Sequence, residues 1–293
     1  HLGARAFEEI GGEVVQTTAF VLSKSNIADF EATYVRLVDY NSQKLKEEAF
    51  LSGNDRYTAK KENFTKIPGC PVAYWVSGAM LKAFEGKHLS DYAQCCTGMQ
   101  TGNNDKYIRM WFEVNYCDTV LYNANGKYKR YNCGGESRKW YGNHTNLVLW
   151  GDNGESIKSE TGSVIRNESY FFKAGISWKR IGSTDFFLRY LPEGFIFDQS
   201  GDSMFVFDQA NLSYILGFVN TKVALGAFEY IAPTLNLTAG NMNKLPIIIS
   251  SNNDIDSLVI SNISLSRADW DAFETSWDFK VHPLVELKEG AGY

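Results

Sequence analysis

Polar side chains are dense just before the aromatic run YIRMWFEV, within the segment CTGMQTGNNDKYIRMWFEVN. Six residues that can donate or accept hydrogen bonds fall within ten positions: Gln100, Thr101, Asn103, Asn104, Lys106 and Arg109. An ordinary hairpin turn needs only one Asn-Gly or Asp-Gly pair. The surplus predicts that this first loop (residues 97–109) binds a polar, anionic partner.

A second loop (residues 129–143) reads KRYNCGGESRKWYGN, in which Gly134-Gly135 favours a turn. After the turn come Arg138, Lys139, Trp140, Tyr141 and Asn143. Arginine can pair with a guanine edge and asparagine with an adenine edge, whereas lysine holds phosphates. A solvent-exposed hairpin with a cation–π pair is the alternative interpretation. Two such loops in one region favour binding.

Ser177-Trp-Lys-Arg180 is a third basic and aromatic cluster, in which Lys179 and Arg180 are the candidate contacts. An amphipathic strand with one solvent-exposed face explains this cluster as well. Arg166 and Arg189 have no polar neighbours of this kind and are expected at the surface.

Signatures of catalysis are mostly missing from the sequence. It contains no H-E-x-x-H, no G-x-S-x-G and no P-loop, and its five cysteines show no C-x-x-C spacing. A nuclease-like set can be assembled from Asp55 and Glu85-Gly-Lys87, but surface charge explains so permissive a pattern better. We therefore expect no catalytic residue and no metal site in this chain.

Composition indicates a globular chain with a local basic region. Of 293 residues, 44% are hydrophobic, and the formal charge is 29 − 34 = −5, which argues against binding nucleic acid by bulk charge. Residues 97–146 nevertheless hold seven Lys or Arg against four acids, a balance of +3. No apolar run is long enough to span a membrane and no secretory signal is recognisable, so we expect a cytoplasmic protein without membrane contact. The sequence lacks an initiator Met and is expected to be a piece of a longer protein.

The elements that must position these loops are mostly short β-strands. Residues 13–23 and 32–40 are expected to form a β-hairpin, and helices are expected near residues 43–51 and 77–84. Further strand candidates are YIRMWFEV, NLVLW, SYFFK, ISWKRI, FFLRYL and SMFVF. Apolar residues at three- and four-residue spacing predict one long packing helix over residues 210–231, and Ser266 is expected to begin a docking helix that carries Trp270, Phe273 and Trp277. The predicted class is α+β, a β-rich domain with a long helix and a short helical tail.

Several runs resemble one known family. They are HLGARAFEEIGGEVVQTTAFVL, PVAYWVS, TGMQTGNNDKYIRMWFEV, GGESRKWYGN, GISWKRI, RYLPEGFIFDQSGDSMF, LGFVNTKVA, APTLN and DWDAFETSWDFKVHPL. In this order they resemble the C-terminal part of the adenine-specific DNA methyltransferases of BREX phage-defence systems, which are related to single-chain restriction–modification enzymes with an Eco57I-like methylase. The resemblance covers nearly the whole chain.

The resemblance implies a division of labour. The family's methyl transfer uses a Gly-rich S-adenosylmethionine site and an Asn-Pro-Pro-Tyr motif, and neither occurs here, so the cofactor is expected in an upstream domain and this chain is expected to be non-catalytic alone. Residues 1–86 would contain the end of the methylase domain, with its closing hairpin, followed by a connector. Residues 87–249 would form a target-recognition domain. Residues 250–293 would form a C-terminal helical segment. Sequence-specific recognition of double-stranded DNA would be its role.

Other partners and classes stay open at this point. The implied partners are the upstream methylase domain, other phage-defence proteins and an acidic phage protein that mimics DNA. The rival classes are a carbohydrate- or protein-binding module, which would use Trp140, Tyr141 and Trp178 as stacking platforms, and a magnesium-dependent nuclease that depends on Glu85.

Overall fold

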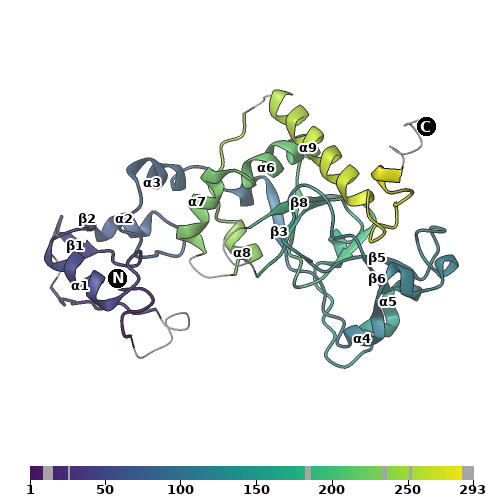
Figure 1. Cartoon of the computed structure of the whole chain (residues 1–293), viewed down its shortest axis with the longest axis horizontal. Helices are drawn as coiled ribbons and strands as arrows, with labels where there is room; N and C mark the ends of the chain where they lie inside the picture. The colour runs from purple at the N-terminus through teal and green to yellow at the C-terminus, as the bar shows by residue number, and fades with distance from the viewer. Residues whose placement is uncertain (9–15, 26, 182–185, 233–235, 251–252, 286–293) are drawn as a thin grey trace. The chain divides into compact units, whose positions relative to one another are not determined.

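The computed structural model describes residues 1–8, 16–25, 27–181, 186–232, 236–250 and 253–285. It contains helices together with small sheets, which confirms the predicted α+β class (Figure 1). The chain divides into two compact units, His1–Glu85 and Gly86–Tyr293. Within the described residues, no helix combines the length and the apolar character that crossing a membrane would require.

The first unit is built around a two-stranded antiparallel sheet. Its elements are β1 (Glu31–Val35), α1 (Gln43–Leu51), β2 (Arg56–Lys60), α2 (Lys61–Thr65) and α3 (Gly78–Phe84). Both predicted helices form, and each starts at a serine: the Ser42 Oγ accepts from the Leu45 N–H, and the Ser77 Oγ accepts from the Met80 N–H.

The predicted hairpin between residues 13–23 and 32–40 is wrong for the part of it that the structure describes. β1 pairs instead with β2, with Thr33 opposite Thr58. Residues 20–22 are exposed, whereas β1 and β2 place aromatic rings on a small core in which Tyr34 stacks on Tyr74 at 4.6 Å between centroids. Burial of those rings favours pairing of β1 with β2, although a longer segment connects these two strands. Residues 13–15 lie outside the described part.

The second unit holds two four-stranded sheets. One has the order β3-β10-β7-β8 and is antiparallel; the other has the order β4-β6-β5-β9, in which β5 and β9 run parallel. The strands are β3 (Ala93–Cys96), β4 (Ile108–Met110), β5 (Tyr128–Asn132), β6 (Asn146–Leu149), β7 (Gly175–Trp178), β8 (Leu188–Leu191), β9 (Phe195–Phe197) and β10 (Ser203–Val206). Side chains of both sheets meet in one hydrophobic core that includes Tyr131, Val148, Phe197 and Phe205.

Helices surround these sheets. They are α4 (Asn104–Tyr107), α5 (Gly151–Lys158), α6 (Leu212–Val219), α7 (Lys222–Ile231), α8 (Ala239–Met242) and α9 (Asn253–Asp271). Short 3-10 turns are η1 (Leu89–Asp91), η2 (Trp111–Glu113), η3 (Tyr116–Asp118), η4 (Glu168–Tyr170) and η5 (Gln209–Asn211). α9 packs along α6 (Figure 1).

The single long helix predicted over residues 210–231 is two helices. The Asn220 side chain leaves the helical path to exchange two hydrogen bonds with the backbone of Leu188, at 3.0 and 3.1 Å. The Thr221 Oγ then accepts from the Ala224 N–H at 3.2 Å and begins α7. Pairing with β8 and a new N-cap therefore divide one apolar pattern into two helices.

The predicted start of a helix at Ser266 is also wrong. Ser266 lies inside α9, which begins at Asn253 and ends at Asp271, so Phe273 and Trp277 follow the helix rather than continue it. The start of α9 was not predicted because the many polar residues along this helix interrupt the apolar spacing.

Candidate functional site

Part of the first loop builds its own scaffold. Asn103 caps α4, because its Oδ1 accepts from the Lys106 N–H at 3.0 Å. Thr101 is buried, and its hydroxyl donates to the Asn104 Oδ1 at 2.6 Å. The backbone of Gln100 pairs with that of Val164. These polar groups therefore hold the loop in shape.

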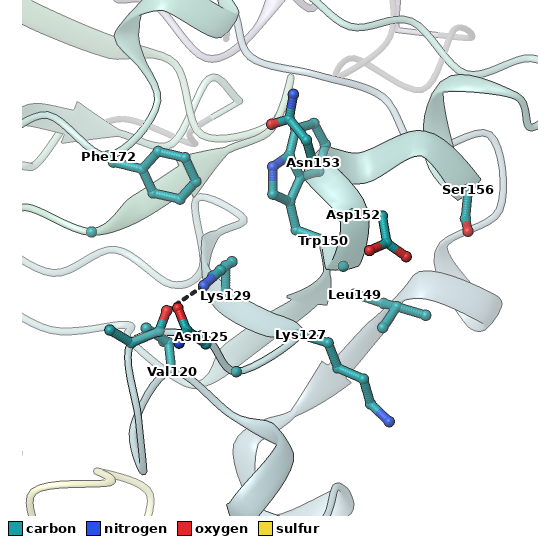
Figure 2. A pocket seen from close by; sticks show the side chains of 14 residues that line it. Val120, Asn125, Lys127, Lys129, Leu149, Trp150, Asp152, Asn153, Ser156 and Phe172 are labelled. Carbon is teal, nitrogen blue, oxygen red and sulfur yellow. Dashed lines mark hydrogen bonds between the residues drawn. The ribbon is translucent and has the colours of Figure 1, made fainter.

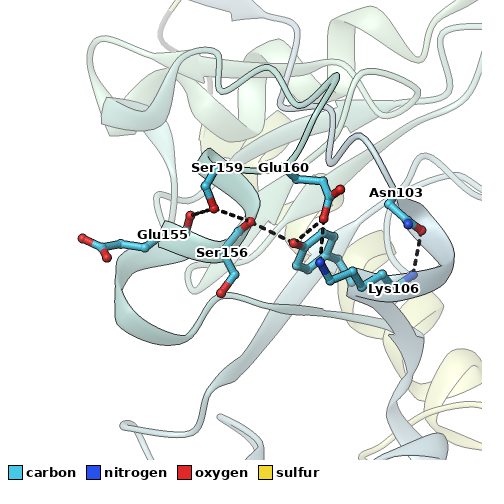
Figure 3. A network of polar contacts seen from close by, with 7 residues as sticks. Asn103, Lys106, Glu155, Ser156, Ser159 and Glu160 are labelled. Carbon is cyan, nitrogen blue, oxygen red and sulfur yellow. Dashed lines mark hydrogen bonds and ion pairs between the residues drawn. The ribbon is translucent and has the colours of Figure 1, made fainter.

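Lys106 is held by an acid from a distant part of the chain. Its ammonium lies 2.7 Å from a carboxylate oxygen of Glu160, and the Tyr107 hydroxyl lies 2.8 Å from the same oxygen (Figure 3). The hydrogen bond with Glu160 raises the pKa of Lys106, and the same bond lowers the pKa of Glu160. The charge of Lys106 is thus matched within the protein.

Arg109 and Asn104 line an open groove of about 550 Å³, which we call the Arg109 groove. Its lining residues are Asn104, Asp105, Ile108, Arg109, Met110, Glu113, Cys133, Asn146, Asp198 and Ser200. One guanidinium nitrogen of Arg109 donates to the carbonyls of Asp105 and Ile108, at 2.5 and 2.6 Å. These contacts fix the side chain along the groove and use only one of its nitrogens.

Two acids of the groove accept hydrogen bonds from the backbone. Asp198 accepts from the backbone N–H groups of Ser200 and Gly201 at 2.8 Å, and burial raises the pKa of its carboxyl. Glu113 accepts from the Met110 N–H at 2.8 Å. A groove with acidic, amide and guanidinium groups suits the mixed donors and acceptors of base edges better than it suits phosphates.

A backbone hydrogen bond places the third cluster next to this groove. The Arg180 N–H donates to the carbonyl of Ser200 at 3.0 Å, and Ser200 lines the groove. Lys179 is exposed and forms no ion pair with any residue that the structure describes. Two of the three predicted clusters therefore adjoin.

The second loop is engaged with α9 and the segment after it. The Arg138 guanidinium pairs with the Asp269 carboxylate, donates to the Tyr141 carbonyl at 2.9 Å and lies 5.2 Å from the centre of the Trp270 ring. Ser266 lies within hydrogen-bonding distance of the carbonyl of Lys139, at 3.1 Å. Such a guanidinium is not free to pair with a base.

Other side chains of the second loop are also committed to the fold. Tyr141 is buried, and the Asn143 side chain donates to the Glu136 carbonyl at 2.7 Å. Trp140 aligns its backbone with β8, and the Lys139 ammonium lies 5.0 Å from the centre of the Phe187 ring. The DNA contacts predicted here stay predictions, but the geometry favours the Arg109 groove over this loop.

Several residues named by the two rival interpretations are engaged within the fold. Trp178 is fully buried and donates its indole N–H to the Leu237 carbonyl, so neither it nor the buried Tyr141 can serve as a stacking platform. Asp55 accepts from the Tyr40 hydroxyl, whereas Glu85 pairs with Lys66. No group of three or more His, Cys, Asp or Glu residues is arranged to hold a metal ion within the described ranges.

Sequence reasoning missed a buried arginine, and the expectation that Arg189 is a surface residue is wrong. Arg189 is fully buried, donates to the Asn132 side chain and the Gly134 carbonyl, and burial lowers its pKa to about 10. His144 is buried nearby among aromatic rings. The apolar neighbours of Arg189 in the run FFLRYL were the available signal.

Comparison with known proteins gives two relatives. The chain is 40% identical over 97% of its length to adenine-specific methyltransferase PglX of Lacticaseibacillus casei (strain Zhang). It is 36% identical over its whole length to adenine-specific methyltransferase BrxX of Escherichia coli O9:H4 (strain HS). The chain spans only about a quarter of either relative, 26% and 24%. No protein-family model matches it.

Proposed function

This chain is related along its whole length to the adenine-specific methyltransferases PglX and BrxX of BREX systems, and on that premise we propose that it recognises DNA sequence for such an enzyme. The match to these methyltransferases along nearly the whole of this chain is the observation that supports the proposal. Since the Asn-Pro-Pro-Tyr motif is absent from the sequence, S-adenosylmethionine and the methyl transfer belong to another part of the longer protein. That part is the first partner we propose.

The Arg109 groove is the proposed reader of base edges. Arg109 can pair with a guanine edge, and Asn104, whose Oδ1 already accepts from Thr101, can donate its amide N–H to an acceptor on a base edge. Lys179 and Arg180 beside it are suited to hold phosphates, which position the duplex without specifying sequence. While this chain holds the duplex, the methylase domain would take the target adenine out of the stack.

The same surface is the proposed docking place for an acidic protein that mimics DNA. Such a protein would present carboxylates where the duplex presents phosphates, and would compete for Lys179 and Arg180. Competition between the two ligands would therefore show one shared surface.

Fluorescence anisotropy on duplex DNA tests the proposed function. A preferred sequence is first selected from a random duplex pool with the whole chain, and binding to it is compared with binding to a scrambled duplex over a salt series. Arg109→Gln is expected to reduce the preference about 5- to 150-fold, corresponding to the roughly 1–3 kcal/mol of a bidentate base contact. Lys179→Gln is expected to reduce the salt slope by about one for both duplexes.

Lys222→Gln is the matched control, because Lys222 is exposed at the start of α7 and lies outside the groove. It should change neither the preference nor the slope. The proposal is wrong if the whole chain binds no duplex at low salt, or if all three variants bind as the wild type does.

A further inference from the structure

A larger cavity of about 730 Å³ lies elsewhere in the second unit, beside β5, β6 and the start of α5. We call it the Phe172 pocket, and Figure 2 shows its lining side chains. Its polar amide, cationic and aromatic lining residues include Asn125, Lys127, Lys129, Trp150, Asn153 and Phe172. Among the three sequence clusters only the second loop includes one of them, its first residue Lys129, and the Arg109 groove includes none, so the pocket needs its own explanation.

Phe172 presents an aromatic ring to this pocket from an unusual backbone position. The run SYFFK was expected to be a strand, but Phe172 has φ 68°, a left-handed conformation that is rare for a bulky side chain. Two backbone hydrogen bonds hold it there, from its N–H to the Phe195 carbonyl at 2.8 Å and from the Gly194 N–H to its carbonyl at 2.9 Å. The side chain is 40% exposed. A ring held in this way is available for stacking.

The wall formed by the start of α5 is also built from left-handed backbone. Asp152, Asn153 and Gly154 have φ values of 50°, 54° and 75° in succession. A Cβ on Gly154 would lie 2.5 Å from the Trp150 ring, so the chain must lie flat against the indole. Unusual backbone positions on two walls of one pocket motivate a functional interpretation.

Two lysines supply positive charge. Lys127 directly precedes β5 and Lys129 lies within it, and Figure 2 shows their side chains extending in different directions from the lining of the pocket. The Lys129 ammonium donates to the Ala124 carbonyl at 2.7 Å and forms no ion pair with a described residue, and burial lowers the pKa of this lysine. Lys127 pairs with Asp118 at 3.0 Å. Asp152 is the one acid among the lining residues.

We propose that the Phe172 pocket binds a nucleotide whose base is not stacked in a duplex. The base would stack on Phe172, the amides of Asn125 and Asn153 would contact its edge, and the Lys129 ammonium would pair with its phosphate. A lone phosphate would make no use of the aromatic wall, and an uncharged ring would make no use of Lys129. That the nucleotide belongs to a DNA strand rests on the proposed function; a free nucleotide offers the same chemistry.

Binding of three probes to the whole chain tests the proposal. They are a fluorescein-labelled single-stranded 12-mer of thymidine, unlabelled dAMP as its competitor, and a blunt duplex. Phe172→Leu keeps an apolar side chain without a π face and is expected to weaken binding of the single strand at least about fivefold. Lys129→Gln is expected to weaken it and to reduce its salt slope. Phe172→Tyr should bind as the wild type does.

Lys173→Gln is the matched control, since Lys173 is exposed, lies over the Tyr170 ring and does not line the pocket. It should leave single-strand affinity unchanged. Equal unfolding midpoints in urea will show that each variant is folded.

The outcomes separate this proposal from the proposed function. Loss of single-strand binding in Phe172→Leu and Lys129→Gln, with duplex binding intact, supports the pocket; displacement by dAMP at comparable concentration assigns it to free nucleotides. Binding of duplex without binding of single strand or dAMP overturns the pocket and keeps the proposed function. Single-strand affinity that is equal in Phe172→Leu and wild type also overturns the pocket.

Discussion

At the scale of single residues, His144 is a titratable group that the fold shields from water. It is almost completely buried between Tyr141 and Phe195, and neither ring nitrogen finds a partner among the described residues. Burial, followed by the charges of Arg189, Arg130 and Arg267, lowers the pKa of His144 well below 6.5. The folded protein therefore keeps this side chain neutral in mildly acidic solution.

His144 should make folding stability depend on pH. Below about pH 6.5 the unfolded chain binds a proton at this histidine and the folded protein does not, so the free energy of unfolding falls as pH falls, by up to about 1.4 kcal/mol per pH unit. His144→Phe should remove that part of the slope. Urea unfolding of wild type and variant between pH 5 and 7.5 measures the difference.

Wild type must be compared with His144→Phe because buried acids change the free energy of unfolding with pH in the opposite direction. Burial raises the pKa of Asp198 and Asp202, so their contribution to stability grows as pH falls through their folded-state pKa values. Both proteins share this contribution. Parallel pH profiles in wild type and His144→Phe would contradict the role given to the histidine.

Residue types in the sequence predicted which loops are polar, but could not predict their partners. Lys106 is matched by Glu160, which is 54 residues away, and Arg138 is matched by Asp269, which is 131 residues away. Whether a cation is free for a ligand depends on such long-range contacts. The first cluster supplies Asn104 and Arg109 to the groove and the third cluster adjoins it, whereas the fold itself uses Arg138 and Asn143 of the second loop.

At the scale of elements, the contact between α6 and α9 depends on a glycine. A Cβ on Gly217 of α6 would lie 2.9 Å from a methyl group of Val259 on α9, and Val259 is buried. The packed branched side chain has little room to move. Gly217 therefore lets the two helices approach closely.

Gly217→Ala should destabilise the protein by about 1–2 kcal/mol, because overpacking at Val259 outweighs the better helix propensity of alanine. Gly226→Ala on α7 is the matched control, since nothing lies within 4 Å of its added Cβ. It should stabilise the protein by up to about 1 kcal/mol. Urea unfolding of both variants checks the signs, and destabilisation of equal size in both would refute the close contact.

Local patterns predicted α1, α3, β6, β7, β8 and β10 well, because their apolar or capping residues are close in sequence. They missed β9, three residues whose parallel partner β5 lies far away along the chain. They also chose the wrong partner for β1 and overlooked the break at Asn220. In each case a long-range contact decided the outcome, and periodicity carries no information about such contacts.

At the scale of the whole molecule, charge pairing reduces the basic character of residues 97–146. Of the seven cations there, Lys106, Lys127 and Arg138 form ion pairs with residues that the structure describes, which leaves four. Of the four acids, Asp118 is paired within this segment, which leaves three, so the unpaired balance is +1 rather than +3. With a net charge of −5 on the whole chain, DNA binding must depend on a few positioned contacts.

The second unit should therefore carry the DNA contacts by itself. Every residue of the Arg109 groove, together with Lys179 and Arg180, lies in Gly86–Tyr293. A fragment of residues 86–293 should unfold in one cooperative transition and bind duplex DNA with the salt slope of the 293-residue chain, no steeper than about −2 for the two phosphate contacts of Lys179 and Arg180. Circular dichroism in urea and anisotropy over a salt series measure both properties, with residues 1–85 as the matched fragment. If the larger fragment folds but its slope is shallower by more than about one, residues 1–85 supply phosphate contacts, and the recognition surface extends beyond the second unit.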